Sequence, residues 1–193
     1  MAASDPNPAI LIAVSWQALN RALAGPAETR LCDCTVMVLF AGFYVEANLN
    51  YVVAQLDRTK DMRAFLGQPY PGLQDKLAWF YNEYVARTRA ADKKTLYRRG
   101  IRLKLRRRFP GFGQLYRFRN DLAHGIVNSS ARSLAKAQGL RKQAKDVVAS
   151  LFTIAAKHGH NIPTPPNYYN AIGMPRPITP PNIRLQPTAT VQP

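Results

Sequence analysis

The stretch Arg-Asn-Asp-Leu-Ala-His-Gly at residues 119–125 holds side chains with complementary chemistry. Arg119 carries a planar charge that matches phosphate oxygens, and His124 titrates near neutral pH, so it can act as a base or an acid. Asn120, directly after the arginine, supplies an amide that can orient either partner. We take Arg119, Asn120 and His124 as candidate catalytic residues for proton transfer beside a phosphate.

The spacing alone carries little weight, because arginine is common in this chain and His124 follows both Arg117 and Arg119. The helical pattern around the motif is more informative. Its apolar stripe consists of Leu115, Phe118 and Leu122. Arg119 projects at the margin of that stripe, so we expect it to be partly buried, where a guanidinium needs a carboxylate, a carbonyl or a ligand phosphate.

Five residues along a regular helix turn the side-chain direction by about 140°. Arg119 and His124 therefore converge only if the helix ends before the histidine or if a second chain supplies one of the pair. Gly125 is well placed to end the helix. The alternative is purely structural: Arg119 pairs with Glu46 inside the protein, and His124 merely caps a helix near Gly125.

Charge is unevenly distributed along the 193 residues. The chain has 27 lysines and arginines against 11 acids, a formal net charge of +16, which favours a polyanionic partner such as nucleic acid. Eleven of these cations lie between residues 87 and 108 beside one acid, Asp92. The alternative for this segment is a solvated basic connector.

We predict that this segment binds RNA by neutralising phosphates, with nearby aromatic residues available to stack on bases. The predicted RNA-binding residues are Arg98, Arg99, Arg102, Lys104, Arg106, Arg107 and Arg108.

The pattern of apolar residues predicts an all-α fold, a compact bundle of about four to five helices, because no alternating strand-like run is evident. A short N-terminal segment, residues 1–25, precedes a helical domain at 26–158. A long helix should begin at Pro26 and run to about Asp57. Because it is apolar nearly all round its middle, it should be central and covered on several sides.

Three further helices are expected: one in 73–85 after a loop at 67–72, one after Pro110 that carries the motif, and one from about Ser130 to Lys157, capped by Ser129 or Ser130. Its expected core positions are Leu134, Val147, Val148, Leu151 and Ile154. Residues 159–193 are rich in proline and poor in charge, so we expect a disordered or extended tail.

The motif Phe-Arg-Asn-Asp-Leu-Ala-His-Gly at 118–125 resembles the signature of the HEPN family (higher eukaryotes and prokaryotes nucleotide-binding). The stretch FYVEANLNYVV at 43–53 also resembles that family's polar-punctuated first core helix. The resemblance covers roughly residues 26–158. It implies a metal-independent endoribonuclease, often a toxin or defence effector, that works as a homodimer with two motifs facing one cleft.

Carried onto this chain, the resemblance implies that Arg119 holds the scissile phosphate and His124 exchanges protons with the 2′-hydroxyl or the leaving 5′-oxygen. The products would carry 2′,3′-cyclic phosphate ends. Glu46 and Asn48, polar residues within the apolar helix, line the same cleft or have a buried structural role. Ile126 stands where some relatives carry a tyrosine that a partner enzyme modifies, which favours a different branch of the family.

No cofactor or metal is expected, because His158, His160 and a pair of cysteines on another helix do not make a plausible ligand set. We expect Cys32 and Cys34 to be reduced core residues in a cytoplasmic protein with no membrane contact. RNA is the expected partner, and a protein antitoxin is a further one. The rival prediction is a non-catalytic RNA-binding or scaffolding module whose work is done by the basic segment.

Overall fold

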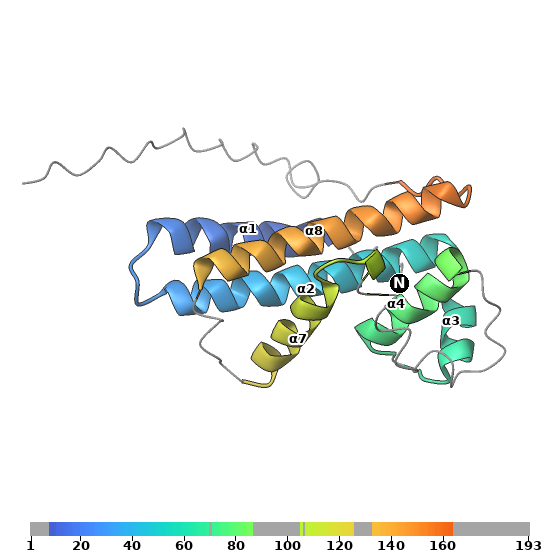
Figure 1. The fold of residues 1–193 in the computed structure, drawn as a ribbon, viewed down its shortest axis with the longest axis horizontal. Coiled ribbons are helices and arrows are strands. Elements are labelled where there is room, and N and C mark those ends of the chain that lie inside the picture. The colour runs from blue at the N-terminus through green and yellow to red at the C-terminus, as the bar shows by residue number, and fades with distance from the viewer. Residues whose placement is uncertain (1–7, 70, 87–104, 106, 126–132, 164–193) are drawn as a thin grey trace, which may run out of the picture.

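The computed structural model describes residues 8–69, 71–86, 105, 107–125 and 133–163. Within these ranges the chain forms six α-helices and one short π-helix, and no strand (Figure 1). The all-α prediction and the compact bundle are confirmed.

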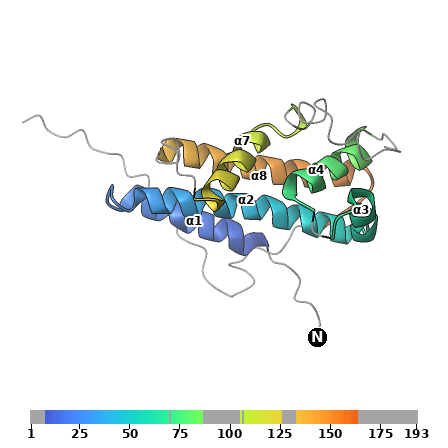
Figure 2. The same ribbon diagram turned by 90° about the horizontal axis from the view of Figure 1, so that it is seen from below.

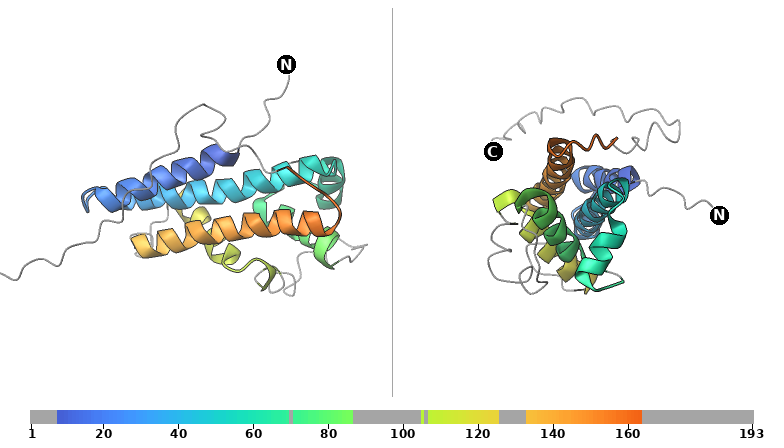
Figure 3. Two further views of the ribbon diagram at one scale, coloured as in Figure 1. Left: turned by 90° about the horizontal axis from the view of Figure 1, so that it is seen from above. Right: turned by 90° about the vertical axis from the view of Figure 1, so that its right-hand side faces the viewer.

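Helix α2 (Arg30–Gln55) is the centre of the bundle, as its apolar middle predicts. Helix α1 (Pro8–Ala24) lies along one side of it and α8 (Leu134–Lys157) along another (Figures 2 and 3). Helix α7 (Phe112–Ala123) packs against α2 and α8 on the lower side of the bundle in Figure 1. Helix α2 begins at Arg30 rather than at Pro26, because residues 27–29 form turns. In the N-terminal segment, α1 packs along α2, and residues 1–7 lie outside the described ranges.

Two polar contacts join α1 to α2. The buried Ser15 hydroxyl donates to the Met37 carbonyl oxygen over 2.9 Å. Arg21 pairs with Asp33 in the first turn of α2, with 2.8 Å between Nε and Oδ1. Asp33 is therefore both satisfied and close to the positive end of the helix dipole.

Beyond α2 the chain makes a short excursion that positions α4. It reverses at Asp57, whose φ is +50°, and forms α3 (Thr59–Leu66), which ends at Gly67 in the left-handed conformation. Helix α4 (Leu73–Tyr81) follows and continues into the π-helix η1 (Asn82–Ala86). The helix expected at 73–85 is present, whereas α3 is an element that the sequence analysis did not assign.

Helix α7 follows Pro110, as predicted, and its stripe of Leu115, Phe118 and Leu122 is buried. At its start Gly111 adopts φ +81°, and a Cβ there would lie 2.2 Å from Cδ of Gln143 in α8. Only glycine lets the two helices approach so closely. At its other end α7 stops at Ala123, and Gly125 turns with φ +72°.

Helix α8 buries Val147, Val148, Leu151 and Ile154 as predicted, and Leu134 is partly buried. The cap of this helix is Ser133, whose hydroxyl accepts from the Lys136 amide. The predicted caps Ser129 and Ser130 lie outside the described residues. After α8 the Tyr51 hydroxyl donates to the Pro163 carbonyl over 3.0 Å, and most of the proline-rich tail lies beyond the described ranges.

The two cysteines are both free, but they differ in environment. Cys34 is buried as expected, and burial raises the pKa of its thiol. Cys32 is exposed, so its assignment to the core was wrong. Residues two apart on a helix are separated by about 200° around the axis, which places the two thiols on opposite sides of α2.

Helix α2 is also long and apolar enough to cross a membrane by length and composition alone. Half of its most apolar window is buried inside the bundle. The core helices of soluble proteins share this property, so the helix by itself does not decide where the protein resides.

Candidate functional site

A single carboxylate joins three helices at the centre of the site. Glu46 on α2 accepts from Lys76 on α4, with 2.9 Å between Nζ and Oε1. Its other oxygen, Oε2, lies 3.4 Å from Nη2 of Arg119 on α7. All three side chains are mostly shielded from solvent, with Lys76 the most deeply placed at 12% exposed. The two cations outnumber the carboxylate, so the cluster keeps one positive charge.

The aliphatic part of Arg119 lies in a close-fitting cradle on α2. A Cβ at position 42 would come within 2.7 Å of Arg119 Cγ, so Gly42 provides the space for this side chain. The guanidinium carbon lies 5.1 Å from the centre of the Phe43 ring, in range of a cation–π interaction. Arg119 Nε is buried without an acceptor. The guanidinium is therefore fixed in place while part of its donor capacity is unused.

Asn120 is the second residue that Arg119 contacts. Arg119 Nη1 donates to Asn120 Oδ1 over 3.0 Å. This bond assigns the two ends of the amide, because the guanidinium has donors only and must face the oxygen. The Asn120 amide nitrogen consequently points away from Arg119.

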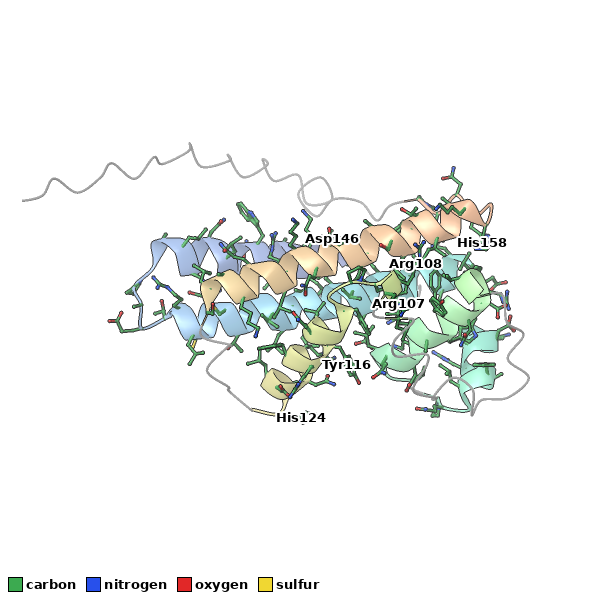
Figure 4. All side chains as sticks on the ribbon, viewed as in Figure 1. Arg107, Arg108, Tyr116, His124, Asp146 and His158 are labelled. Carbon is green, nitrogen blue, oxygen red and sulfur yellow. The ribbon has the colours of Figure 1, made fainter. Side chains whose placement is uncertain are left out.

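His124 is the C-cap residue of α7, and its side chain is exposed (Figure 4). Its backbone amide closes the helix by donating to the carbonyls of Asn120 and Asp121. Among the described residues its ring makes no hydrogen bond, ion pair or ring contact, with Arg119 or with any other residue. The helix ends before the histidine, as convergence of the pair requires, and the Arg119–Glu46 pair of the structural alternative is also present.

The two polar residues predicted to line the cleft have different surroundings. Glu46 is part of the cluster, whereas Asn48 is 2% exposed and its amide donates to the Tyr44 carbonyl one turn earlier in α2. That bond ties the Asn48 amide nitrogen to its own helix. The structure therefore joins Glu46 to Arg119 and gives Asn48 a local structural contact.

Of the basic segment at residues 87–108, the structure describes only residues 105, 107 and 108. Arg107 and Arg108 are exposed and lie just before α7, at the end of that helix opposite to His124 (Figure 4). The predicted RNA-binding residues 98, 99, 102, 104 and 106 lie outside the described residues. Lys136 adds a cation at the start of α8, with Nζ 4.5 Å from the centre of the Phe118 ring.

Sequence reasoning missed Lys76, Phe43 and Gly42. Their place in the site is visible only in the folded protein, where Lys76 contacts Glu46 and the other two contact Arg119. Gly42 did carry a signal, because a glycine inside a long helix weakens it unless something must approach closely. Within the described ranges no group of three or more histidine, cysteine or acidic residues is arranged to hold a metal ion.

The chain was compared with protein-family models, with curated proteins and with solved structures, and none of them matches.

Proposed function

We propose that this protein is a HEPN-type endoribonuclease, with Arg119, Asn120 and His124 in its active site. The observation that carries the proposal is the end of α7. Arg119 is fixed there by Glu46 and Asn120, and an exposed histidine caps the same helix one turn later. A fixed guanidinium and a free imidazole near one end of the same helix, on a strongly cationic chain, suit the transfer of protons at an RNA phosphate.

In this reaction His124 removes the proton of a 2′-hydroxyl, and the 2′-oxygen attacks the adjacent phosphorus. The bond from phosphorus to the 5′-oxygen breaks, and the 5′-hydroxyl leaves with a proton from a second acid. The products are a 2′,3′-cyclic phosphate and a free 5′-hydroxyl. A homodimer would supply the second acid as the partner's copy of the same histidine.

A second function is favoured by the same ion pair. Because Glu46 partly neutralises Arg119, the pair can equally serve the stability of the bundle. The protein would then be a non-catalytic RNA-binding module, acting through Arg106, Arg107 and Arg108. The first proposal also includes a toxin-like role for the protein. It further includes a protein antitoxin as a partner and a cytoplasmic location.

The deciding experiment incubates purified protein with total RNA in chelator and compares wild type with His124→Ala. We expect wild type to cleave and His124→Ala to be slower by about 10²-fold or more, because general acid–base catalysis contributes on that scale. The thermal midpoint should not change, since the ring is exposed. The cleaved ends should carry the cyclic phosphate.

His160→Ala is the matched control, because this second exposed histidine lies outside the cluster and should leave cleavage intact. If wild type binds RNA without cutting it, and charge reversal at Arg106, Arg107 and Arg108 abolishes binding, the non-catalytic function is correct. Cleavage that disappears in chelator would reject the mechanism.

A further inference from the structure

The contacts of the site form a series that ends at Asn120. Lys76 holds one oxygen of Glu46, the other oxygen holds Arg119, and Arg119 holds the Asn120 oxygen. Each donor–acceptor step involves at least one charged group, although the Glu46–Arg119 step is long at 3.4 Å. The Asn120 amide at the end of the series is therefore oriented by its bond from Arg119.

The orientation leaves the Asn120 amide nitrogen without a partner among the residues that the structure describes. Its oxygen is occupied by Arg119, and in the described part of the structure the two N–H groups of Nδ2 donate to nothing. The side chain is partly exposed, so a ligand can reach these donors. Arg119 gives one bond to Asn120 and one to Glu46, its Nε is buried without an acceptor, and its side chain is only 23% exposed.

Asn120 also lies between two other accessible side chains on one face of α7. Tyr116, Asn120 and His124 are spaced four residues apart, so they follow one another along the same side of the helix. Tyr116 is partly exposed and stacks on Phe112, with 5.8 Å between ring centres. Successive members are separated by a rise of about 6 Å along the axis, which suits neighbouring groups of an extended RNA strand.

We infer that the Asn120 amide, rather than the Arg119 guanidinium, donates to the RNA phosphate beside His124, while Tyr116 stacks on the adjoining base. Arg119 is then a positioning residue that acts through Asn120. This inference rests on the proposed function, since it concerns the same site. It selects single-stranded RNA, because a base must be unpaired and accessible to stack on an aromatic ring.

The sharpest variant is Asn120→Asp. It keeps an oxygen for Arg119, so the fold and the series of contacts remain, but it replaces the outward donor by an anionic acceptor that repels a phosphate. We expect cleavage of single-stranded RNA to fall by about 10²-fold with no loss of thermal stability. Binding of a fluorescein-labelled oligonucleotide, made uncleavable by 2′-O-methyl groups, should weaken by about tenfold or more.

Gln114→Glu is the matched control, because it makes the same change of charge at an exposed position of the same helix. It should weaken binding much less than Asn120→Asp. If the two variants weaken binding equally, the effect is general electrostatics and the assignment of Asn120 is overturned. Cleavage and binding at the wild-type level in Asn120→Asp would also overturn it, and the nuclease proposal would stand.

A double-mutant cycle tests the role of Arg119. If Arg119 acts through Asn120, then Arg119→Lys slows wild type but adds little to the loss in Asn120→Ala. Losses that multiply would show that Arg119 contacts the phosphate independently, and would overturn its role as a positioning residue. Thermal midpoints of all variants identify any that fail to fold.

The same experiments distinguish a failure of the nuclease proposal from a failure of the assignment of Asn120. Wild type that binds the oligonucleotide without cleaving RNA rejects the nuclease, and the binding of Asn120→Asp still decides the role of Asn120. Wild type that neither binds nor cleaves overturns both.

Discussion

The two ends of the bundle use histidine in opposite ways. At the end of α8, His158 and His160 pack against the ring of Tyr84, with centres 5.6 and 5.9 Å apart. At the end of α7, His124 is exposed, and no ring contact to it is present in the described structure. Figure 4 shows His124 and His158 in separate parts of the molecule.

The difference separates the packing role of His158 and His160 from the chemical role that we propose for His124. Tyr84 is 6% exposed and is flanked by Trp79 and Phe80, so the two histidines complete the cover of an aromatic cluster. The His124 imidazole covers nothing comparable. A histidine without packing contacts is free to serve a ligand, whereas the ring contacts of His158 and His160 with Tyr84 give those two a packing role.

The largest expected effect is on the free energy of unfolding, and it tests the Tyr84 cluster at the end of α8. Tyr84→Ala should lower the free energy of unfolding by about 3–5 kcal/mol, because it removes a buried aromatic ring. His124→Ala should change it by less than about 0.5 kcal/mol, as exposed positions usually do. Chemical denaturation measures both. Equal losses in the two variants would show that His124 also packs, and the contrast between the ends would disappear.

A smaller effect on the free energy of unfolding is expected at the contact between Gly42 and Arg119, beside the proposed active site. In Gly42→Ala the new methyl group would lie 2.7 Å from Arg119 Cγ, so Arg119 must move away from Glu46. Strain of this kind exceeds the gain in helix propensity, and we expect a net loss of about 1 kcal/mol together with slower RNA cleavage.

Gly139→Ala is the control for that substitution, because nothing lies within 4 Å of a Cβ at this helical position. It should raise the free energy of unfolding by about 0.5–1 kcal/mol. If Gly42→Ala is stabilising as well, Arg119 is not held in the way described.

The smallest effect concerns pH at the packing end. Burial raises the pKa of Tyr84, although Arg58 acts against the shift. The folded state therefore favours the neutral phenol. The resulting stability is fully present below the unfolded pKa of about 10 and is lost as the pH rises through the higher folded pKa.

Denaturation at a series of alkaline pH values should thus show a falling free energy of unfolding, and Tyr84→Phe should make the fall less steep. Burial also raises the pKa of Tyr44, which contributes in the same direction. A Tyr84→Phe variant that loses stability as steeply as wild type would contradict this account.

The helical skeleton could be predicted from local sequence because its signals are local. The apolar middle of α2, the proline before α7 and the glycine after His124 each act within a few residues. Helix α3 was missed because its eight residues have a short apolar pattern, and its boundaries depend on the left-handed backbone at Asp57 and Gly67. The π-helical turn at Asn82–Ala86 was likewise not predicted, and within it Tyr84 contacts Phe80.

The candidate site could be predicted in part. Partial burial of Arg119 followed from its place beside an apolar stripe, and Glu46 was recognised as its alternative partner. Lys76 could not be found, because it meets Glu46 across 30 residues of chain and through an element whose orientation depends on α3. The direction of the Asn120 amide is set by that same distant set of contacts.

The bond between Tyr51 and Pro163 has a practical consequence. It draws the chain after α8 back over the upper side of the bundle, whereas α7 lies on the lower side (Figures 1 and 3). At Pro163 the described chain therefore lies on the side of the bundle opposite to α7. A label attached to the protein at that position would leave the α7 face, with His124, clear for an oligonucleotide.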